Sequence, residues 1–324
     1  MGRVIAVANA KGGIGKTTTV VNIGAGLALK GARVLLVDVD PQGNLALALG
    51  VHPRRTLYDL LADGAKAADC VIAARQNLDV LASDDSLLSV QPIIARRADW
   101  SRALDHGLRP LYADYDFVLL DSGGSLTILN TNALACASDV IVPTAIEHFS
   151  LKSIDLLFSQ VKQVKGNSNS IRLIVPTMFD PRVRQSGELL AKLKARFGAL
   201  VADPIRVNVR LSEAPTLGKT IYEYDPRSRG AIDYALLVER LSAQFGYRTT
   251  ERVAGALPPM APTPVPVPAP AVEYVPPVSS TFRGPPGCPN CGHPLQFATL
   301  AGYRVAYCEN CKYKNQTLAQ GPRR

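Results

Sequence analysis

The stretch NAKGGIGKTT, near the N-terminus, contains the residue types of a phosphate-binding loop. Gly15, Lys16 and Thr17 fit the end of the general pattern GxxxxGK followed by Ser or Thr. We expect Lys16 to contact the β- and γ-phosphates of a nucleotide, and the Thr17 hydroxyl to hold Mg²⁺. The first glycine of the pattern is replaced by Ala10, and a second lysine, Lys11, follows it directly. The pattern does not explain this second lysine.

The loop lies between an apolar run, RVIAVAN at 3–9, and a helical pattern, TTTVVNIGAGLALKG at 17–31. A strand, a glycine-rich turn and a helix in this order are the setting that a phosphate-binding loop requires. We expect Gly12, Gly13 and Gly15 to let backbone amides approach phosphate oxygens at the positive end of the helix.

Carboxylates close two of the other apolar runs. Asp121 ends FVLLD, where it is expected to orient the water shell of a bound Mg²⁺. Asp38 and Asp40 end RVLLVDVD, and the alternation of a strand places both on one side. One of these two is expected to position or activate an attacking water. Carboxylates at strand ends also cap helices, but their occurrence beside this loop favours metal and water chemistry.

Residues 1–253 alternate apolar runs with longer helical patterns, such as LKSIDLLFSQVKQVK at 151–165. The runs are rich in Val, Ile and Leu, as strands covered on both faces are. This alternation predicts an α/β fold with a doubly wound, mostly parallel sheet. The runs lie at 3–9, 33–40, 78–83, 117–122, 139–146, 171–178 and 204–209.

Five blocks of the sequence resemble the ParA/Soj family of DNA-partition ATPases: KGGIGKTT, VLLVDVDPQGN, YDFVLLDSGGSLTILNTNAL, VNVRLSEAP and YDPRSRGA. They occur in this order over about residues 1–250. The resemblance implies a P-loop NTPase of the deviant Walker A class that binds ATP and closes into a two-nucleotide sandwich homodimer. It also implies slow ATP hydrolysis, nonspecific binding to double-stranded DNA, and release stimulated by a ParB-like partner.

The resemblance gives roles to individual residues. Lys11 would reach across the dimer to the partner's phosphates, as an arginine finger does, and would act in catalysis with Lys16 and Asp40. Asp40 would position the hydrolytic water. The implied Mg²⁺ site consists of Thr17, Asp38 and Asp121. The implied nucleotide-binding residues are Lys11, Gly12, Gly13, Ile14, Gly15, Lys16, Thr17 and Thr18, with Asn208 at the adenine.

The chain departs from the family at two places. The family's Cys-Pro-Pro-Ser after the strand is Ser-Gly-Gly-Ser at 122–125, and glycine in place of proline loosens the backbone. Slower hydrolysis, or altered coupling between nucleotide state and conformation, is expected. Val207 occupies the position of the family's DNA-contacting arginine, which leaves open whether Arg206 replaces it.

The formal net charge of +9 favours a polyanionic partner. The sequence contains no base-reading motif, so contacts to phosphates and salt-sensitive, sequence-independent DNA binding are expected. For any single residue, a solvated surface position is the simpler interpretation. The predicted DNA-binding residues are Arg182, Arg184, Lys192, Lys194, Arg206, Arg210, Lys219, Arg227 and Arg229.

The C-terminal part has a different composition. Eleven of the 24 prolines fall within 254–287, which predicts an extended linker rather than a strand or helix; a ligand for a proline-binding domain is the alternative. Within 288–324, two CxxC pairs separated by sixteen residues match a four-cysteine Zn²⁺ site, and disulfides are the alternative. We expect a zinc ribbon with a hairpin near Gly302, serving nucleic-acid contact or protein docking. The predicted zinc ligands are Cys288, Cys291, Cys308 and Cys311.

Two functions follow from these observations. The first is an ATPase that positions DNA or another cargo, in the cytoplasm and on the nucleoid. The alternative is a poorly hydrolysing, ATP-dependent regulatory protein that recruits partners through its ribbon. No apolar run is long enough to cross a bilayer, and neither a signal peptide nor a membrane-targeting amphipathic helix is apparent, so no membrane partner is expected.

Overall fold

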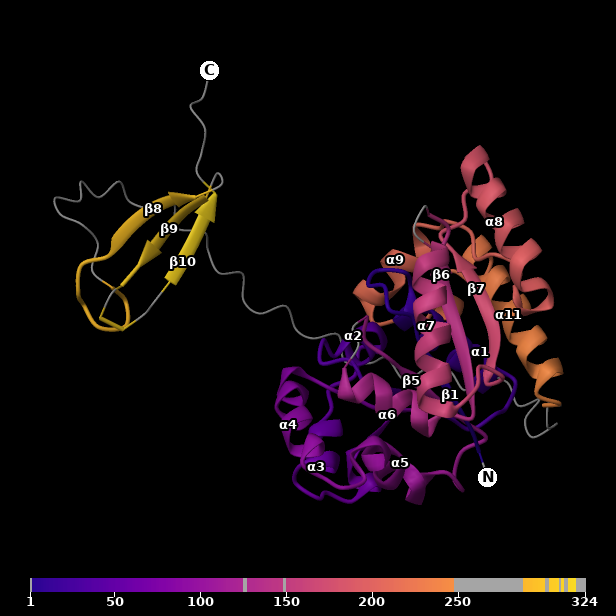
Figure 1. Ribbon diagram of the computed structural model, residues 1–324, viewed down its shortest axis with the longest axis horizontal. Coiled ribbons are helices and arrows are strands. Elements are labelled where there is room, and N and C mark those ends of the chain that lie inside the picture. Colours follow the sequence, from indigo (N-terminus) through magenta and orange to yellow (C-terminus); the bar gives the residue numbers. More distant parts are fainter. Residues whose placement is uncertain are drawn as a thin grey trace. The chain divides into compact units, whose positions relative to one another are not determined.

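The computed structural model describes residues 2–124, 127–147, 150–247, 288–300, 303–308, 310–311 and 314–318. Its contacts divide the chain into two units, Met1–Ala256 and Leu257–Arg324, and each is described by itself (Figure 1). The predicted linker at 254–287 lies outside the described residues. No described helix is long and apolar enough to cross a bilayer.

The first unit is built on a seven-stranded sheet in the order β3-β4-β2-β5-β1-β6-β7. All neighbouring strands are parallel except β3 and β4, which pair antiparallel at one edge. The strands are β1 (Arg3–Val7), β2 (Val34–Asp38), β3 (Val71–Arg75), β4 (Leu78–Leu81), β5 (Phe117–Asp121), β6 (Asp139–Ala145) and β7 (Ile171–Thr177).

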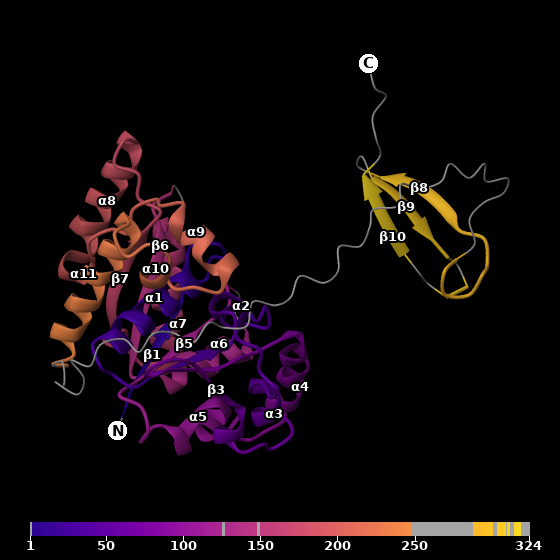
Figure 2. The same cartoon turned by 180° about the vertical axis from the view of Figure 1, so that it is seen from behind.

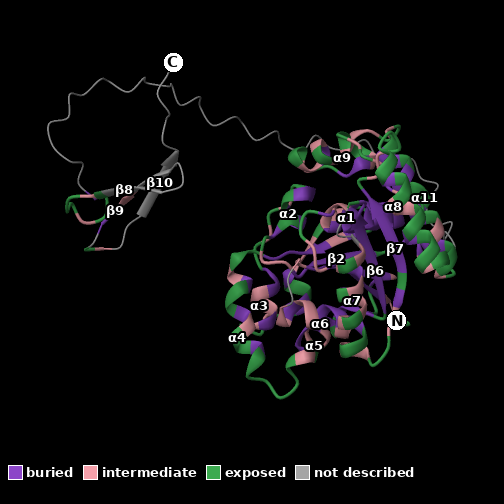
Figure 3. Ribbon diagram, turned by 45° about the horizontal axis from the view of Figure 1, so that its top comes forward, coloured by how far each residue is buried: buried purple, intermediate pink, exposed green. Residues whose placement is uncertain are grey.

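Successive residues of each strand point to opposite faces of the sheet, and both faces are buried. On β1, Val4 and Ala6 belong to one apolar core, whereas Ile5 and Val7 belong to the other. Figure 3 shows the strands buried and the outer sides of the helices exposed. The near-continuous apolar runs of the sequence are thus explained by a sheet covered on both sides.

Helices α1 (Lys16–Leu29) and α11 (Arg229–Gln244) cover one face, and α6 (Ile128–Cys136) and α7 (Ser150–Lys165) cover the other (Figures 1 and 2). The remaining α-helices are α2 (Asn44–Leu49), α3 (Leu57–Leu61), α4 (Val90–Ala95), α5 (Ala103–Leu108), α8 (Arg184–Phe197), α9 (Arg210–Glu213) and α10 (Ile221–Tyr224). The 3₁₀-helices are η1 (Ala67–Cys70), η2 (Asp85–Ser89), η3 (Trp100–Arg102), η4 (Arg109–Leu111), η5 (Gly198–Leu200) and η6 (Ala214–Leu217).

The predicted α/β fold with a doubly wound, mostly parallel sheet is confirmed, and so are six of the seven predicted strands. The strand predicted at 204–209 is wrong. This segment makes only an isolated bridge, between Arg206 and Phe179, and then turns into α9. Pro204 supplies no amide hydrogen to a ladder, which weakens strand pairing there. The edge strand β3 was not expected.

The second unit contains β8 (Gln296–Leu300), β9 (Tyr303–Tyr307) and β10 (Lys314–Leu318) in an antiparallel sheet ordered β10-β9-β8. Leu300 pairs with Tyr303, so β8 and β9 form the expected hairpin. The predicted turn at Gly302 itself lies outside the described residues. The third strand, β10, was not predicted.

Candidate functional site

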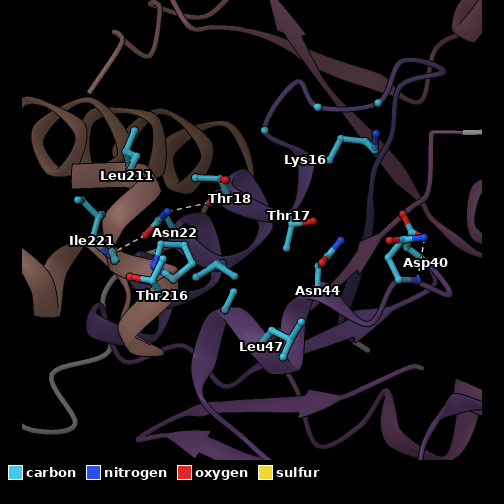
Figure 4. Close-up of a pocket in the computed structure, with 18 of the residues that line it drawn as sticks. Lys16, Thr17, Thr18, Asn22, Asp40, Asn44, Leu47, Leu211, Thr216 and Ile221 are labelled. Atoms are coloured by element: carbon cyan, nitrogen blue, oxygen red, sulfur yellow. Dashed lines mark hydrogen bonds between the residues drawn. The ribbon is translucent and has the colours of Figure 1, made fainter. Parts of the chain in front are cut away.

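A pocket of about 650 Å³ opens beside the carboxyl ends of the parallel strands. This is where ligands bind in open α/β sheets, because the strand ends and the following loops meet there. In Figure 4, Lys16 and Asp40 lie toward one end, and Thr216 and Ile221 toward the other. The loop after β1, the start of α1, α2, η6 and α10 all contribute to its lining.

The predicted phosphate loop forms one wall of this pocket. A Cβ atom added to Gly12, Gly13 or Gly15 would meet no heavy atom within 4 Å, so the space above the loop is open. Gly15, the residue before α1, has a φ of 84°, a left-handed conformation that favours glycine. The first amides of α1 have no partner within the helix. The result is a cradle that suits an anion.

Lys16 is buried at the base of this cradle, and its Nζ donates a hydrogen bond to the Lys11 carbonyl oxygen at 2.8 Å. Burial lowers the pKa of Lys16, and the charges of Asp121 and Asp40 oppose that change. The ammonium is therefore poorly solvated and bound to the loop's own backbone. A phosphate would replace a neutral acceptor with an ionic one, and charge-assisted hydrogen bonds are the stronger.

Asp121 and Asp38 are paired in register at the ends of β5 and β2, and both are buried. Neither carboxylate oxygen of Asp121 has a hydrogen-bond partner within the described ranges. Burial and the charge of Asp38 raise the pKa of Asp121 well above its usual value. Buried, unpartnered carboxylate oxygens beside a second acid fit a divalent cation, for which oxygen ligands are preferred.

Asp38 has other contacts. Its carboxylate accepts hydrogen bonds from the backbone amides of Leu45 at 3.0 Å and Asp40 at 3.1 Å. Burial nevertheless raises its pKa to about 6. Asp38 thus ties the loop that carries Asp40 to the first residues of α2, in addition to facing Asp121.

Asp40 lines the pocket, with its side chain held by the loop that follows β2. Its Oδ1 accepts a hydrogen bond from the Gln42 amide at 3.1 Å, and Ser83 donates to its carbonyl oxygen. A Cβ at Gly123 would lie 3.3 Å from Asp40 Oδ2. The Asp40 carboxylate therefore faces the segment after β5, which contains Gly123 and Gly124.

Gly124 lines the same pocket and approaches the phosphate loop closely. A Cβ at this position would lie 3.1 Å from the Gly12 nitrogen and 3.2 Å from its Cα. A side chain here would have to displace backbone rather than a flexible group. The glycines that were expected to loosen this segment thus also allow it to pack against the loop.

The second lysine has a partner in its own chain. Lys11 Nζ lies 2.6 Å from Glu147 Oε1, just beyond β6, and both side chains are partly exposed. Sequence reasoning missed Glu147, because nothing in the spacing of these two residues indicates that they meet.

The apolar end of the pocket is lined by Val21, Ala48, Leu211, Pro215 and Ile221, among others. This surface, flanked by the cradle, has room for the flat and less polar part of a nucleotide. Sequence reasoning identified none of these residues, since an apolar side chain at a pocket looks like any core residue.

One asparagine near this end, Asn22, was not predicted, and another, Asn208, does not lie where it was expected. Asn22 joins α1 to α10: its amide donates to the Thr18 carbonyl oxygen at 2.8 Å, and its Oδ1 accepts from the Ile221 amide at 3.0 Å. Asn208, the predicted adenine contact, is not among the lining residues and instead accepts a hydrogen bond from the Arg210 amide at 2.9 Å. The structure therefore does not bring Asn208 into the pocket.

The predicted DNA-binding residues separate into two groups. Arg206 forms a short ion pair with the buried Asp233, at 2.6 Å, and is committed to that contact. Arg182, Arg184, Lys194 and Arg210 also pair with carboxylates. Among the described residues, no ion pair is seen for Lys192, Lys219, Arg227 or Arg229.

In the second unit the four cysteines come together. Their Sγ atoms all lie within 4.8 Å of one another. Cys288 and Cys311 are 3.4 Å apart, and Cys291 and Cys308 are 3.5 Å apart. Ligands of a tetrahedral Zn²⁺ at about 2.3 Å are separated by about 3.8 Å, and a disulfide requires about 2.05 Å. A hydrogen bond from the His293 backbone lowers the pKa of Cys291 to about 6. The cluster fits a zinc ribbon.

Comparison with known proteins places this site in a family. A family model described as "AAA domain" matches residues 2–173. The chain is 39% identical over 255 residues to the sporulation initiation inhibitor protein Soj of Bacillus subtilis, covering 75% of this chain and 99% of that protein. It is 39% identical over 249 residues to the chromosome partitioning protein ParA of Caulobacter vibrioides, covering 74% and 93%.

A solved structure is also similar: cobyrinic acid a,c-diamide synthase of Mycobacterium smegmatis with a bound ATP analog and magnesium. The TM-score is 0.66 with 30% identity, over 77% of this chain and 98% of that one. The fold, the loop and these relatives agree: the chain belongs to the ParA/Soj family of P-loop partition ATPases.

Proposed function

We propose that this ATPase positions DNA or a large cargo on DNA, through an ATP-bound sandwich homodimer that binds DNA nonspecifically. Hydrolysis stimulated by a ParB-like partner then releases the dimer, and nucleoid association follows from the DNA binding. The observation that carries this proposal is the two-lysine loop, which forms an open cradle beside the unpartnered carboxylate of Asp121. The names of the partitioning relatives support the cargo class.

In this proposal the phosphates of ATP rest on the loop amides and on Lys16. Thr17 and Asp121 hold Mg²⁺, with Asp38 beside them. The bound ion would offset phosphate charge. The pocket volume of about 650 Å³ and its apolar far end leave room for the base and ribose.

Asp40 is the residue proposed to orient the attacking water, since its carboxylate lines the pocket and is fixed by the Gln42 amide. Lys11 would leave Glu147 and reach the partner's phosphates in the dimer. The Lys11 ammonium would thus be paired in both states, with Glu147 in the monomer and with a phosphate in the dimer.

The proposed DNA face comprises Lys192, Lys219, Arg227 and Arg229, of which Lys219 also lines the nucleotide pocket. These cations have no ion-pair partner in the described part of the chain and are exposed. Arg206 is not part of this face, because its guanidinium is bound by Asp233. A dimer doubles the number of phosphate contacts, so DNA affinity rises steeply when ATP closes it.

The ribbon is proposed to bind one Zn²⁺ through its four cysteines, with the metal supplying most of its folding free energy.

The test is ATP turnover by the purified protein, with and without nonspecific duplex DNA. Weak turnover that DNA raises, and that Asp40→Ala abolishes, is the expected result. Asp63→Ala, which changes an exposed carboxylate outside the pocket, is the matched control. Turnover that is unchanged in Asp40→Ala would contradict the assigned role of that carboxylate.

A second candidate is an ATP-dependent regulatory protein that hydrolyses ATP very slowly. The observation in its favour is that Gly123 lies beside Asp40 and Gly124 beside Gly12. The family pattern has two prolines at these positions, which would hold the backbone more rigidly. Two results together would favour this candidate. ATP would drive DNA binding, and neither the wild type nor Asp40→Ala would hydrolyse ATP, even when the activating partner is added.

A further inference from the structure

Two walls of the pocket meet at a pair of glycines. Gly50 follows α2, which lines the pocket with Asn44, Leu47 and Ala48, and Gly218 follows η6, which lines it with residues 214–216. A Cβ on Gly218 would lie 2.7 Å from the Gly50 Cα. The backbones of the two walls are therefore in direct contact.

Arg75, the last residue of β3, lies outside the pocket lining and forms hydrogen bonds to both walls. Its Nη2 donates to the Gly218 carbonyl oxygen at 2.7 Å, and its Nη1 donates to the Leu49 carbonyl oxygen at 3.3 Å. Both acceptors lie at the C-terminal ends of helices, where the carbonyls have no helical partner and the negative end of the dipole attracts a cation.

The same guanidinium reaches a third element. Its Nε donates to Glu223 of α10, and Nη2 lies 3.3 Å from the second oxygen of that carboxylate. Glu223 also accepts a hydrogen bond from the Thr220 amide at 2.8 Å, which caps α10. Ile221, the first residue of α10, lines the pocket and donates to Asn22.

We propose that Arg75 is a positioning residue for the nucleotide. By binding the ends of α2 and η6 and the start of α10 together, it sets the separation of the walls on either side of the base. This inference rests on the proposal that ATP lies with its phosphates on the loop and its base at the apolar end. Arg75 does not line the pocket, so it acts through the walls.

The phosphate cradle belongs to other elements, the loop after β1 and the first turn of α1. Loss of Arg75 should therefore weaken interactions with the base without changing those with the phosphates. A lysine at this position offers one compact ammonium and cannot match the fork that bridges two carbonyls and a carboxylate.

The experiment compares binding of Mg–ATP with binding of inorganic tripolyphosphate, which occupies the cradle alone. Arg75→Ala should bind ATP about ten-fold more weakly, as expected for loss of charge-assisted hydrogen bonds, while tripolyphosphate binding is unchanged. The KM for ATP should rise with little change in kcat. Arg75→Lys should restore part of the affinity, and Arg55→Ala, which breaks an exposed ion pair with Asp69, is the matched control.

Gly218→Ala tests the same wall without touching Arg75, and it remains informative if Arg75→Ala does not fold. The added Cβ would push Gly218 away from Gly50 and so separate the two walls of the pocket. The affinity for ATP should therefore fall, and the affinity for tripolyphosphate should be unchanged. ATP affinities within about two-fold of the wild type in these variants would overturn the inference. So would a parallel loss of ATP and tripolyphosphate binding. A wild-type protein that binds neither compound would instead refute the proposed nucleotide site itself.

Discussion

Lys11 and Lys16 belong to one short loop, yet their ammonium groups have different surroundings. Lys16 is buried against a backbone carbonyl, whereas Lys11 is paired with Glu147 near the surface. Burial favours a fixed role at the phosphates, and the exposed ion pair favours a group that can change partner. Exposed ion pairs contribute only about 0.2–1 kcal/mol to stability, so separating Lys11 from Glu147 costs little free energy.

Asp121→Asn should make the nucleotide-free protein more stable, because burial and the nearby Asp38 carboxyl disfavour the charged form of Asp121, whereas an amide carries no charge. Burial of a neutral amide costs less free energy than burial of a charge, and we expect a gain of about 1 kcal/mol. In a domain of this size, each kcal/mol shifts Tm by about 2–4 °C. Thermal unfolding without ligand, with ATP and with Mg–ATP would measure the effect.

The same variant should lose the part of the ATP stabilisation that depends on Mg²⁺. A ligand-free Asp121→Asn protein that melts below the wild type would contradict the assignment of Asp121 as a metal-binding group held without protein partners.

Gly124→Ala should lower kcat/KM for ATP by about ten-fold, since its Cβ would press on the Gly12 backbone and shift the loop. The control is Gly187→Ala in α8, where an added Cβ meets nothing within 4 Å. Steady-state ATPase kinetics of both variants check this. Equal activity of the two variants and the wild type would show that the close approach has no consequence.

The sequence was sufficient to predict the loop that forms the open cradle, because a short local pattern carries it. It did not predict Glu147, Asn22 or Arg75 as parts of the site. Each is brought there by contacts between residues distant in the chain: Lys11 and its partner Glu147, for example, are 136 positions apart.

At the level of the elements, the strand ends determine the site. Parallel pairing of β2 with β5 sets Asp38 opposite Asp121, and pairing of β5 with β1 sets Asp121 beside the start of the loop. The apolar runs predicted these strands well. They gave a wrong prediction at 204–209, because this apolar segment packs against α11 and does not join the sheet. They did not predict β3, because its short sequence VIAAR carries little pattern.

Asp139, at the start of β6, links the sheet to two arginines. Its carboxylate is 1% exposed and accepts hydrogen bonds from Arg3 and Arg172 at 2.6 Å each, and from Ser138 at 2.8 Å. Burial alone would raise its pKa, but the hydrogen bonds from Arg172, Ser138 and Arg3 bring the pKa of Asp139 below its usual value. The ionised form is therefore stabilised in the folded state.

Asp139→Asn should lower the free energy of unfolding by about 2 kcal/mol near neutral pH, because hydrogen bonds to a charged group are lost. A lowered carboxyl pKa contributes stability above the unfolded value of 3.8, and that contribution is lost as the pH falls through the folded pKa. Denaturant unfolding of both proteins at decreasing pH should show the difference shrinking below that value. A difference independent of pH would mean that packing, not charge, explains it.

In the whole molecule, the two units are expected to fold by different means. The α/β unit has large apolar cores on both faces of its sheet. A three-stranded sheet of this size is too small to form a large core, so we expect a metal held by the four cysteines to stabilise it. The spacing of the sequence alone predicted the four cysteines that the structure brings together, but the sequence carried too few periodic residues to predict β10.

Cys308→Ser should reduce the zinc content of the purified protein from about one ion per chain and unfold the ribbon, with little effect on basal ATP turnover. Metal analysis and ATPase assays would test this, with Cys136→Ser in the α/β unit as the control. Full zinc content in Cys308→Ser would contradict the four-cysteine site.

If the protein positions DNA as proposed, its DNA binding must depend on the bound nucleotide. Fluorescence anisotropy of a labelled nonspecific duplex would be measured with protein alone, with Mg–ADP and with Mg–ATP, at several salt concentrations. We predict tight, salt-sensitive binding only with ATP, weakened by combined Arg227→Ala and Arg229→Ala substitutions, which lie outside the pocket lining, but little changed by Arg206→Ala. Equal binding in all three nucleotide states would contradict the proposed ATP-dependent binding to DNA.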